Sequence, residues 1–437
     1  MAAILDQPRS KCALAAIQTA QAIPGVLPIL HAGPGCAYKL VGNRGTSGRF
    51  AANVFPCTNV GESEIVFGGE EKLRENIQSA LKVIDADLYM VFTGCTTEIV
   101  GDDVQQIVES YADEVKPVLY VSAPGFKGSN YLGYEWVLEA LIRQYMQDAP
   151  AVRQGLVNIW GGVPFQDPSA VNDLRVLESL IAKLGFQPNT IFGNGRGVNN
   201  VNIVPAAEYN VLVSPWAGLS TMKLLKERFG TPFFHYPVRP VGAVETSAFL
   251  RAFARFASVD AALVEPVIAS EEDRFYYYLE QWADSFLEET VTSQHFSIAA
   301  DAYTALGIAK FLVNNMGFIP EMQFITDDPP EEYREAISKY FSDNVSGIPM
   351  PILFEDDGYQ IKETMKRLDY VDKPLIIGSF YEKQVAAELR GSYLETAWPV
   401  VERRIIVSSY VGYDGGLRLL EDLTSPAVKT EGRMVYF

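Results

Sequence analysis

The sequence has 437 residues, of which 48% are hydrophobic and 21% are charged, and its formal net charge is −18. This composition excludes a disordered chain, and the acidic balance argues against non-specific binding to nucleic acid or to an anionic membrane surface. At about 150 residues per domain, the length predicts roughly three domains.

The start of the chain, "MAAILDQPRSKCALAA", lacks the basic-then-apolar pattern of a secretion signal, because Asp6 interrupts the apolar run. The sequence also has no run of about 18 apolar residues that could cross a membrane. We therefore expect a cytoplasmic protein without membrane or nucleic-acid partners. In that compartment cysteine thiols stay reduced.

Short apolar runs alternate with amphipathic stretches along the whole chain. The strand-like runs are "GVLPIL" and residues 88–94, 117–125, 156–162, 209–215, 351–356, 373–379 and 403–409. The helix-like stretches are residues 70–84, 102–115, 173–185, 220–230, 271–291, 302–317 and 332–341. Near-continuous apolar strands that alternate with helices predict parallel sheets with helices on both faces.

This pattern restarts after "YMQDAP" near residue 150 and again near residue 290. We therefore predict an α/β fold of three doubly wound, parallel-sheet (Rossmann-like) domains that surround one site. The predicted domains are residues 1–150, which carry all the cysteines, residues 151–290, and residues 291–437 with a C-terminal tail.

The chain has four cysteines, Cys12, Cys36, Cys57 and Cys95. Cys36 ends "LPILHAGPGC" and Cys95 ends "LYMVFTGC", so a strand is expected to run into a turn and stop at Cys36. Ligands bind beyond the carboxyl ends of parallel strands, where both cysteines would lie.

Three thiolates can hold a soft metal or an iron–sulfur cluster. Gly33 and Gly35 would let the backbone approach a bulky inorganic group. Three buried, inert cysteines remain the alternative, because the spacings match no zinc finger or ferredoxin pattern. A nucleophilic cysteine assisted by His31, His235 or His295 has little support.

Several motifs in order along the chain, "KCALAA", "HAGPGC", "VFGGEEKLRENI", "TGCTTEIVGDDV", "APGFKGSNYLGY" and "YVGYDGG", resemble those of component 1 proteins of the nitrogenase superfamily. The resemblance extends along essentially the whole chain and is densest in residues 10–135. It implies the nitrogenase component 1 fold. Any one of these motifs alone would be a weak signal, whereas their order and spacing together are a strong one.

In that family, three cysteines per subunit hold a P-cluster (8Fe–7S), or a simpler 4Fe–4S cluster, at the boundary between two subunits. The matching motifs place these ligands at Cys12, Cys36 and Cys95, whereas Cys57 matches no ligand and is interpreted as a structural thiol. The resemblance implies an α-type catalytic partner in an α2β2 heterotetramer. It also implies an ATP-hydrolysing iron protein that docks at Phe67, although a Phe in such a sequence is otherwise often a core residue.

The chain resembles the β-type, electron-relaying subunit of the family. The family's α-type subunit holds its catalytic cofactor through a Cys in mid-chain and a His before "GYDG". Here Ser214 or Pro215 and Val411 stand at those places, and no cysteine follows Cys95. Gly125 stands where the nitrogenase β subunits have a serine in a "PSF" context, so this chain resembles a nitrogenase-like oxidoreductase outside the true nitrogenases.

Within the superfamily, the resemblance points to methylthio-alkane reductase, which cleaves C–S bonds and releases methanethiol. The alternatives are the β subunit of an unusual nitrogenase, a tetrapyrrole or cofactor-maturation reductase, and a scaffold on which a cluster is assembled. A metal-free interaction protein with buried thiols is a further alternative from a different class.

Other motifs have simpler interpretations. "GNGRG" at 193–197 suggests dinucleotide binding, but we predict a loop that is not followed by a helix. "GDD" at 101–103 and the glutamates of "GGEEKL" suit helix starts. "RFYYYLEQW" suits a packed helix at a subunit interface or an aromatic stacking surface. Lys39 and Arg44 suit either cluster charge or simple solvation.

Overall fold

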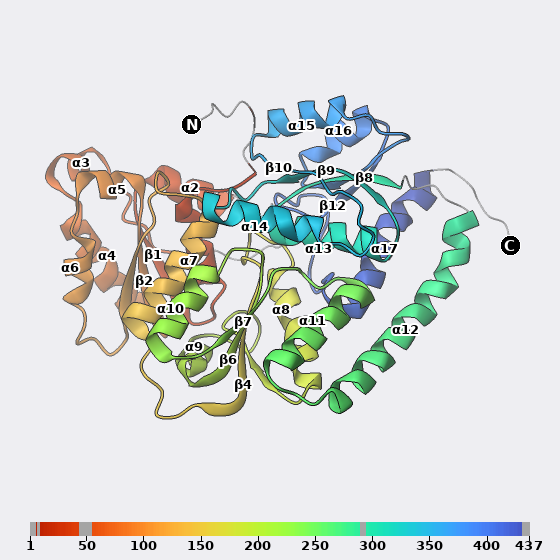
Figure 1. The fold of residues 1–437 in the computed structure, drawn as a ribbon. Helices are drawn as coiled ribbons and strands as arrows, with labels where there is room; N and C mark the ends of the chain where they lie inside the picture. The colour runs from red at the N-terminus through yellow and green to blue at the C-terminus, as the bar shows by residue number, and fades with distance from the viewer. Residues whose placement is uncertain (1–5, 7–8, 43–54, 289–293, 431–437) are drawn as a thin grey trace.

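A computed structural model of the chain describes residue 6 and residues 9–42, 55–288 and 294–430. Three parallel β-sheets follow one another along the chain, and helices cover their faces (Figure 1). All strand pairings between the named strands are parallel, which confirms the predicted α/β class.

The first sheet has the order β1-β2-β3. Its strands are β1 (Val26–His31), β2 (Leu88–Thr93) and β3 (Val118–Ser122). Its helices are η1 (Ala13–Ala16), α1 (Ile17–Gln21), α2 (Pro34–Gly42), α3 (Glu62–Phe67), α4 (Glu70–Val83), α5 (Cys95–Val100), α6 (Val104–Glu109), α7 (Asn130–Ala140) and η3 (Leu141–Tyr145).

The second sheet has the order β5-β4-β6-β7, which reverses direction after β4 as a doubly wound sheet does. Its strands are β4 (Arg153–Trp160), β5 (Gln187–Asn189), β6 (Ala207–Val213) and β7 (Phe233–Tyr236). Its helices are α8 (Ala170–Lys183), α9 (Val198–Ile203), η4 (Val204–Ala206), α10 (Leu219–Phe229), α11 (Gly242–Phe256) and α12 (Ala261–Glu288).

The third sheet, with the order β10-β9-β8-β11-β12, is doubly wound as well. Its strands are β8 (His295–Ala300), β9 (Ile319–Ile325), β10 (Ile352–Phe354), β11 (Leu375–Gly378) and β12 (Ser392–Glu395). Its helices are α13 (Ala302–Asn314), α14 (Glu331–Ser342), α15 (Gly358–Arg367), α16 (Glu382–Glu388) and α17 (Gly412–Thr430).

Burial on both faces explains the apolar runs of the central strands. Every residue of β2, "LYMVFT", is buried. Tyr89 and Val91 lie in a core that includes Leu73 and Ile77 of α4, and Met90 lies in a second core on the other face. This second core continues through the helices and strands of all three sheets. The strands of the three sheets fall within residues 1–150, 151–290 and 291–437, and the division into three domains stays a prediction.

The predicted strand at 403–409 is wrong, because this segment forms no ladder. The carboxylate of Glu395 instead accepts hydrogen bonds from the amides of Val401, Glu402 and Arg403, at 2.7, 3.1 and 2.8 Å. Ile406 and Val407 are 76% and 69% exposed, so the apolar residues of this segment do not belong to the core.

Other predicted elements differ in length. The helix expected at 102–115 is confined to α6, and the helix expected at 271–291 begins ten residues earlier as α12, with Pro266 in its second turn. Figure 1 shows α12 and α17 side by side at one end of the molecule. In the described parts of the chain, no helix is both long and apolar enough to span a membrane.

Candidate cluster-binding site

Each of the three sheets together with its helices is called a unit below, in chain order. Cys12 lies where the N-terminal segment crosses the first unit. It is the N-cap residue of η1 and forms an isolated antiparallel bridge with Ser129. The amide of Ala13 donates to the carbonyl of Gly128 at 2.9 Å, so Cys12 is fixed against the loop that follows β3. Cys12 is exposed, which places this sulfur at the surface of the chain.

Cys36 lies in the first turn of α2. The strand β1 ends at His31, before the predicted end at Cys36, because Pro34 begins the helix. Proline is favoured at the first helical position, since its missing N–H has no partner there in any case. Cys36 is therefore presented by a helix start beyond the carboxyl end of β1.

Cys95 is the first residue of α5, directly beyond β2. The carbonyl of His31 accepts hydrogen bonds from the amide of Gly94 at 3.0 Å and from the hydroxyl of Thr97 at 2.9 Å. A Cβ atom on Gly94 would lie 2.7 Å from the Cβ of Ala32, so only glycine lets the two strand ends approach this closely. The structure thus brings Cys36 and Cys95 to one edge of the sheet.

Gly125, in the loop after β3, lies beside the sulfur atoms of Cys95 and Cys12. Its amide donates a hydrogen bond to Sγ of Cys95 at 3.1 Å. A Cβ atom at this position would lie 3.4 Å from Sγ of Cys95 and 3.5 Å from Sγ of Cys12. Any larger residue at position 125 would therefore fill the space between the two thiols. The sequence singles out Gly125 only because the nitrogenase β subunits have a serine at this position, and it does not predict the contact with the cysteines.

The surroundings of Cys36 disfavour its thiolate. Burial raises the pKa of the Cys36 thiol, and negative charge on Cys12, Cys95 and Cys57 raises it further. Several thiolates this close together repel one another unless cations compensate them. Bound metal ions do this, because a coordinating thiol is deprotonated by the ion.

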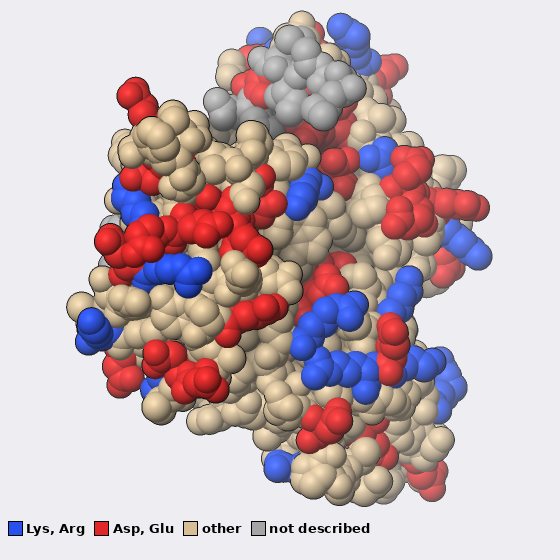
Figure 2. Space-filling model, turned by 90° about the vertical axis from the view of Figure 1, so that its left-hand side faces the viewer, with Lys and Arg blue, Asp and Glu red and all other residues tan. Residues whose placement is uncertain are grey.

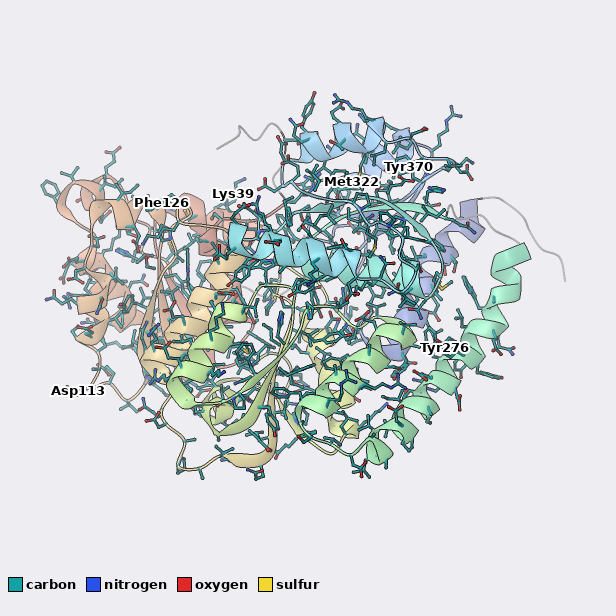
Figure 3. All side chains as sticks on the ribbon, viewed as in Figure 1. Lys39, Asp113, Phe126, Tyr276, Met322 and Tyr370 are labelled. Atoms are coloured by element: carbon teal, nitrogen blue, oxygen red, sulfur yellow. The ribbon has the colours of Figure 1, made fainter. Side chains whose placement is uncertain are left out.

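The metal-binding role of the cysteines stays a prediction. Within the described residues, no three or more His, Cys, Asp or Glu side chains lie close enough together to hold a single metal ion. Cys12 is exposed, and so are two apolar side chains that lie close to Cys36 and Gly125 in the sequence, Tyr38 at 77% and Phe126 at 60%. Lys39 and Phe126 are labelled on this part of the molecule in Figure 3.

Cys57 lies beside the group but has bonds of its own. It pairs with Leu30 through an isolated parallel bridge. Its Sγ lies 3.6 Å from the carbonyl of Ala32 and accepts from the amide of Asn59 at 3.4 Å. These contacts agree with a structural thiol that holds the chain against the end of β1.

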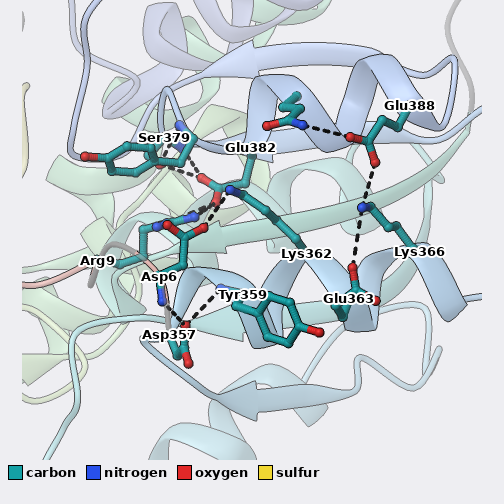
Figure 4. A network of polar contacts seen from close by, with 12 residues as sticks. Asp6, Arg9, Asp357, Tyr359, Lys362, Glu363, Lys366, Ser379, Glu382 and Glu388 are labelled. Atoms are coloured by element: carbon teal, nitrogen blue, oxygen red, sulfur yellow. Dashed lines mark hydrogen bonds and ion pairs between the residues drawn. The ribbon is translucent and has the colours of Figure 1, made fainter. Parts of the chain in front are cut away.

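A buried ion pair anchors the segment that carries Cys12. The guanidinium of Arg9 donates to Oε1 of Glu382 at 2.6 and 3.0 Å, and both side chains are almost fully buried (Figure 4). Asp6 pairs with Lys362 at 2.8 Å in the same network. The first cysteine is therefore positioned by the third unit, which its place in the sequence did not reveal.

Lys11 adds a second anchor beside Cys12. Its Nζ donates to Oε1 of Gln18 at 3.0 Å and to the carbonyl of Phe165 at 3.2 Å, and it lies over the ring of Trp398. Burial lowers the pKa of Lys11 to about 7. All three units thus contribute contacts to the N-terminal segment.

A buried His–Asp pair links the two cysteine loops to the "VFGG" loop. Nε2 of His31 lies 2.9 Å from Oδ2 of Asp102, and Oδ1 of Asp102 accepts from the amide of Gly69 at 2.8 Å. Nδ1 of His31 lies 3.1 Å from the hydroxyl of Thr58. Burial lowers the pKa of His31, although Asp102 opposes this shift.

The neighbouring Asp103 has the role that "GDD" predicted, because its carboxylate caps α6 by accepting from the amide of Gln106 at 3.0 Å. Glu70 and Glu71 lie in the first turn of α4, as expected. The sequence did not distinguish Asp102 from these helix-start residues, since its partners are distant along the chain.

Phe67 is the last residue of α3 and is 86% exposed. The core alternative for this residue is therefore wrong. Ile65 and Val66 are also exposed, at 51% and 70%, so α3 presents a small apolar tip. Figure 2 views the side of the molecule that carries α3, where bands of acidic side chains alternate with uncharged surface. Docking of a partner at Phe67 stays a prediction.

Other residues stand at the two positions where an α-type subunit would have its cofactor ligands, and both are buried. Ser214 follows β6 and is buried, with its carbonyl accepting from Nε2 of His235 at 2.8 Å. Val411 is also buried. The indole of Trp216 donates to Oδ2 of Asp327 at 2.6 Å in the space between the second and third sheets. None of these side chains is a metal ligand of the expected kind.

The "GNGRG" segment is a loop as predicted, but the prediction that no helix follows is wrong. The short helix α9 begins at Val198. The amide of Val198 donates to the carbonyl of Pro24 at 3.2 Å, and a Cβ atom on Gly197 would lie 2.3 Å from that oxygen. The helix start is thus occupied by the first unit, which leaves no pyrophosphate site there.

Two other expectations concern surface residues. Lys39 is exposed on α2, which agrees with solvation, whereas Arg44 lies outside the described residues. In "RFYYYLEQW", Phe275 is buried and Tyr276, Tyr277 and Tyr278 are 40%, 58% and 53% exposed on α12. The helix itself is confirmed, and its interface role stays a prediction.

Comparison with known proteins supports the sequence resemblance. Residues 12–427 match the family described as "Nitrogenase component 1 type Oxidoreductase". The nitrogenase molybdenum-iron protein beta chain of Clostridium pasteurianum is 21% identical over 434 residues, which cover 94% of this chain and 90% of that protein.

One subunit of the light-independent protochlorophyllide reductase of Stigeoclonium helveticum is 25% identical over 341 residues. The match covers 74% of this chain but only 63% of that relative's length. A solved structure described as "Nitrogenase Cp1 at pH 6.5" superposes with a TM-score of 0.81 at 19% identity, covering 100% of this chain and 96% of that one. This likeness confirms the nitrogenase component 1 fold.

Proposed function

We propose, from the premise that this chain belongs to the family of nitrogenase component 1 type oxidoreductases, that it is the β-type subunit of a nitrogenase-like reductase. The observation that carries the proposal is that Gly125 lies beside the sulfur atoms of Cys95 and Cys12, while Cys36 begins a helix at the same end of the first sheet. Three thiols alone cannot cap every iron of a large cluster. A partner subunit would supply the remaining ligands.

Cys12, Cys36 and Cys95 would hold an iron–sulfur cluster, either a P-cluster or a 4Fe–4S cluster, shared with the α-type partner. When bound, such a cluster supplies one-electron storage and transfer. The amide of Gly125 would donate a hydrogen bond to a ligand sulfur, which tunes the reduction potential. Covering by the partner would exclude water from the exposed Cys12.

The partners follow from the same proposal. The α-type subunit would carry the catalytic cofactor, because Ser214 and Val411 offer no ligand for it in this chain. Two such heterodimers would form an α2β2 assembly. An ATP-hydrolysing iron protein would dock on the apolar tip at Phe67 and deliver electrons toward the cysteines. The cytoplasm is the proposed location, since the four free thiols persist in a reducing compartment.

The proposed reaction of the assembly is reductive C–S cleavage of methylthio-alkanes. Two electrons and two protons convert the methylthio-alkane into the alkane and methanethiol. Gly125 in place of a serine supports a reductase outside the true nitrogenases. The alternatives are an unusual nitrogenase, a tetrapyrrole-type reductase and a cofactor-assembly scaffold, and the light-independent protochlorophyllide reductase relatives favour the second of these.

An activity assay separates these functions. The complex, purified without oxygen together with its α-type partner and iron protein, is given ATP and a methylthio-alkane, and methanethiol is measured. We expect ATP-dependent release of methanethiol. Ethylene from acetylene without methanethiol would indicate a nitrogenase, and reduction of protochlorophyllide would indicate a tetrapyrrole reductase. Transfer of the cluster to a second apoprotein, without turnover, would indicate a scaffold.

A further inference from the structure

Glu98 lies three residues after Cys95 on the short helix α5, and the proposed function gives it no role. Its carboxylate accepts hydrogen bonds from three side chains. Oε1 accepts from the hydroxyl of Ser122, at the end of β3, at 2.7 Å, and from that of Thr93, at the end of β2. Oε2 accepts from Nζ of Lys127 at 3.2 Å. One carboxylate thus joins the ends of two strands to a lysine in the loop that follows β3.

The carboxylate of Glu98 holds this loop at both of its ends. Ser122 is the last residue before the loop, and Lys127 lies near its far end, before α7 begins. Nζ of Lys127 also donates to the hydroxyl of Ser122 at 3.0 Å, and the amide of Lys127 donates to the carbonyl of Pro124 at 3.0 Å. The loop is therefore closed on itself and tied to α5, the helix that begins with Cys95.

The closed loop presents the amide of Gly125 to Sγ of Cys95, at 3.1 Å. Further along the loop, the carbonyl of Gly128 accepts from the amide that follows Cys12, at 2.9 Å. The loop thus contacts the segments that carry two of the predicted cluster ligands. Its position decides whether the N–H of Gly125 points at the sulfur.

The contact between Glu98 and Lys127 is an ion pair. Burial would raise the pKa of Glu98, but the hydrogen bonds from Thr93, Ser122 and Lys127 outweigh this effect, so the pKa is lowered. The side chains of Glu98 and Lys127 are 20% and 47% exposed, and exposed ion pairs add little to the stability of a whole fold. The geometry therefore favours a local role, which is to fix the loop against α5.

We propose that Glu98 and Lys127 are positioning residues, which hold the amide of Gly125 on the sulfur of Cys95 and thereby raise the reduction potential of the cluster. A hydrogen bond to a ligand sulfur withdraws negative charge from a cluster, so it stabilises the reduced form. This inference rests on the proposed function, because it concerns the cluster that Cys95 would bind.

The test is the reduction potential of the complex, purified without oxygen with its α-type partner, in a redox titration followed by electron paramagnetic resonance. The double variant Glu98→Gln/Lys127→Met replaces one anion and one cation with neutral side chains, so the net charge near the cluster is unchanged. The amide oxygen of the new side chain at position 98 can still accept from Ser122, which preserves the local fold. We expect the reduction equilibrium to shift tenfold toward the oxidised form, which is about 59 mV for one electron.

Two further variants serve as controls. Asp85→Asn/Lys116→Met removes an exposed ion pair of the same charges before the other end of β3. Lys127→Arg keeps a cation that can pair with Glu98. Both should keep the wild-type potential. A potential equal to that of the wild type in Glu98→Gln/Lys127→Met, with the cluster present, would overturn the proposal.

Hydrogen–deuterium exchange of the metal-free full chain separates this inference from the proposed function. The amides of residues 125–128 should exchange at least tenfold faster in Glu98→Gln/Lys127→Met than in the wild type, and at the wild-type rate in Asp85→Asn/Lys116→Met. Equal exchange in the first variant and the wild type would overturn the proposal. A wild-type complex without iron would contradict the proposed function and the effect on the potential, whereas faster exchange would still show that the two residues hold the loop.

Discussion

His31 and Asp102 are in contact across the first unit, with Nε2 of the imidazole 2.9 Å from Oδ2 of the carboxylate. His31 precedes the turn to Cys36, and Asp102 follows the helix that begins with Cys95. The second carboxylate oxygen holds the amide of Gly69, two residues after the exposed Phe67. One buried pair therefore fixes the cysteine loops and the proposed docking tip relative to each other.

Removal of this carboxylate should destabilise the first unit. In Asp102→Ala, the imidazole of His31 and the amide of Gly69 lose their partner, and buried groups without partners cost about 1–3 kcal/mol each. We expect a loss of about 2–4 kcal/mol in the free energy of unfolding. Chemical denaturation followed by tryptophan fluorescence measures it.

Asp103→Ala is the matched control, because it removes only the cap of α6, worth about 1 kcal/mol. Equal losses in the two variants would contradict the role assigned to the His31–Asp102 pair.

Phe67→Ala should affect docking without affecting stability. The side chain is 86% exposed, so its removal changes the free energy of unfolding by about 0.5 kcal/mol or less. We expect the iron-protein concentration at half-maximal rate to rise at least tenfold. Val115→Ala, which truncates an equally exposed side chain on a different loop, should behave like the wild type. An unchanged half-maximal concentration in Phe67→Ala would exclude docking at this tip.

The anchor of the N-terminal segment gives a prediction about stability. Arg9→Ala leaves Glu382 buried without its cation, which costs about 3–5 kcal/mol. Arg143→Ala removes an exposed pair with Glu139, worth about 0–1 kcal/mol, and serves as the control. Thermal unfolding of the two variants should differ clearly. Equal thermal midpoints for Arg9→Ala and Arg143→Ala would show that the ion pair with Glu382 does not anchor the N-terminal segment.

A buried carboxyl group predicts how stability depends on pH. Burial, together with the charges of Asp167 and Asp327, raises the pKa of Asp301 from 3.8 to about 7. A group that binds its proton more tightly in the folded chain adds stability at low pH. This contribution is lost as the pH rises from about 4 through about 7.

Asp301→Asn keeps an acceptor for the amide of Thr304 but cannot ionise. The thermal midpoint of the wild type should therefore fall more steeply between pH 5 and pH 8 than that of the variant, and above neutral pH the variant should be the more stable. Parallel pH profiles for the two proteins would contradict a raised pKa at Asp301.

Much of the fold could be predicted because its signals are local. The apolar run of β2 and the amphipathic pattern of α4 describe burial that each segment shows by itself. The segment at 403–409 is similarly apolar, yet it forms no strand, because the amides of Val401 and Arg403 donate to the carboxylate of Glu395 instead of to a neighbouring strand. No local pattern distinguishes a strand from a segment whose hydrogen-bond partner lies elsewhere.

The candidate site also has a part that local sequence predicts and a part that depends on distant residues. The positions of Cys36 and Cys95 beyond strands could be predicted, although β1 ends at His31 and a turn separates it from Cys36. The anchoring of Cys12 through Arg9 and Glu382 joins residues 373 positions apart, and the contact of Gly125 with Cys95 depends on a side chain that is absent. Such relationships exist only in the folded chain.

The most direct test of the central claim is the iron and acid-labile sulfide content of the complex, purified without oxygen with its α-type partner. We expect more iron per heterodimer than one four-iron cluster holds, with a clear loss in Cys95→Ala and none in Cys57→Ala. Iron near four would indicate the simpler cluster of the tetrapyrrole-reductase type. Absence of iron, with Cys95→Ala merely less stable, would contradict the account and leave three ordinary thiols.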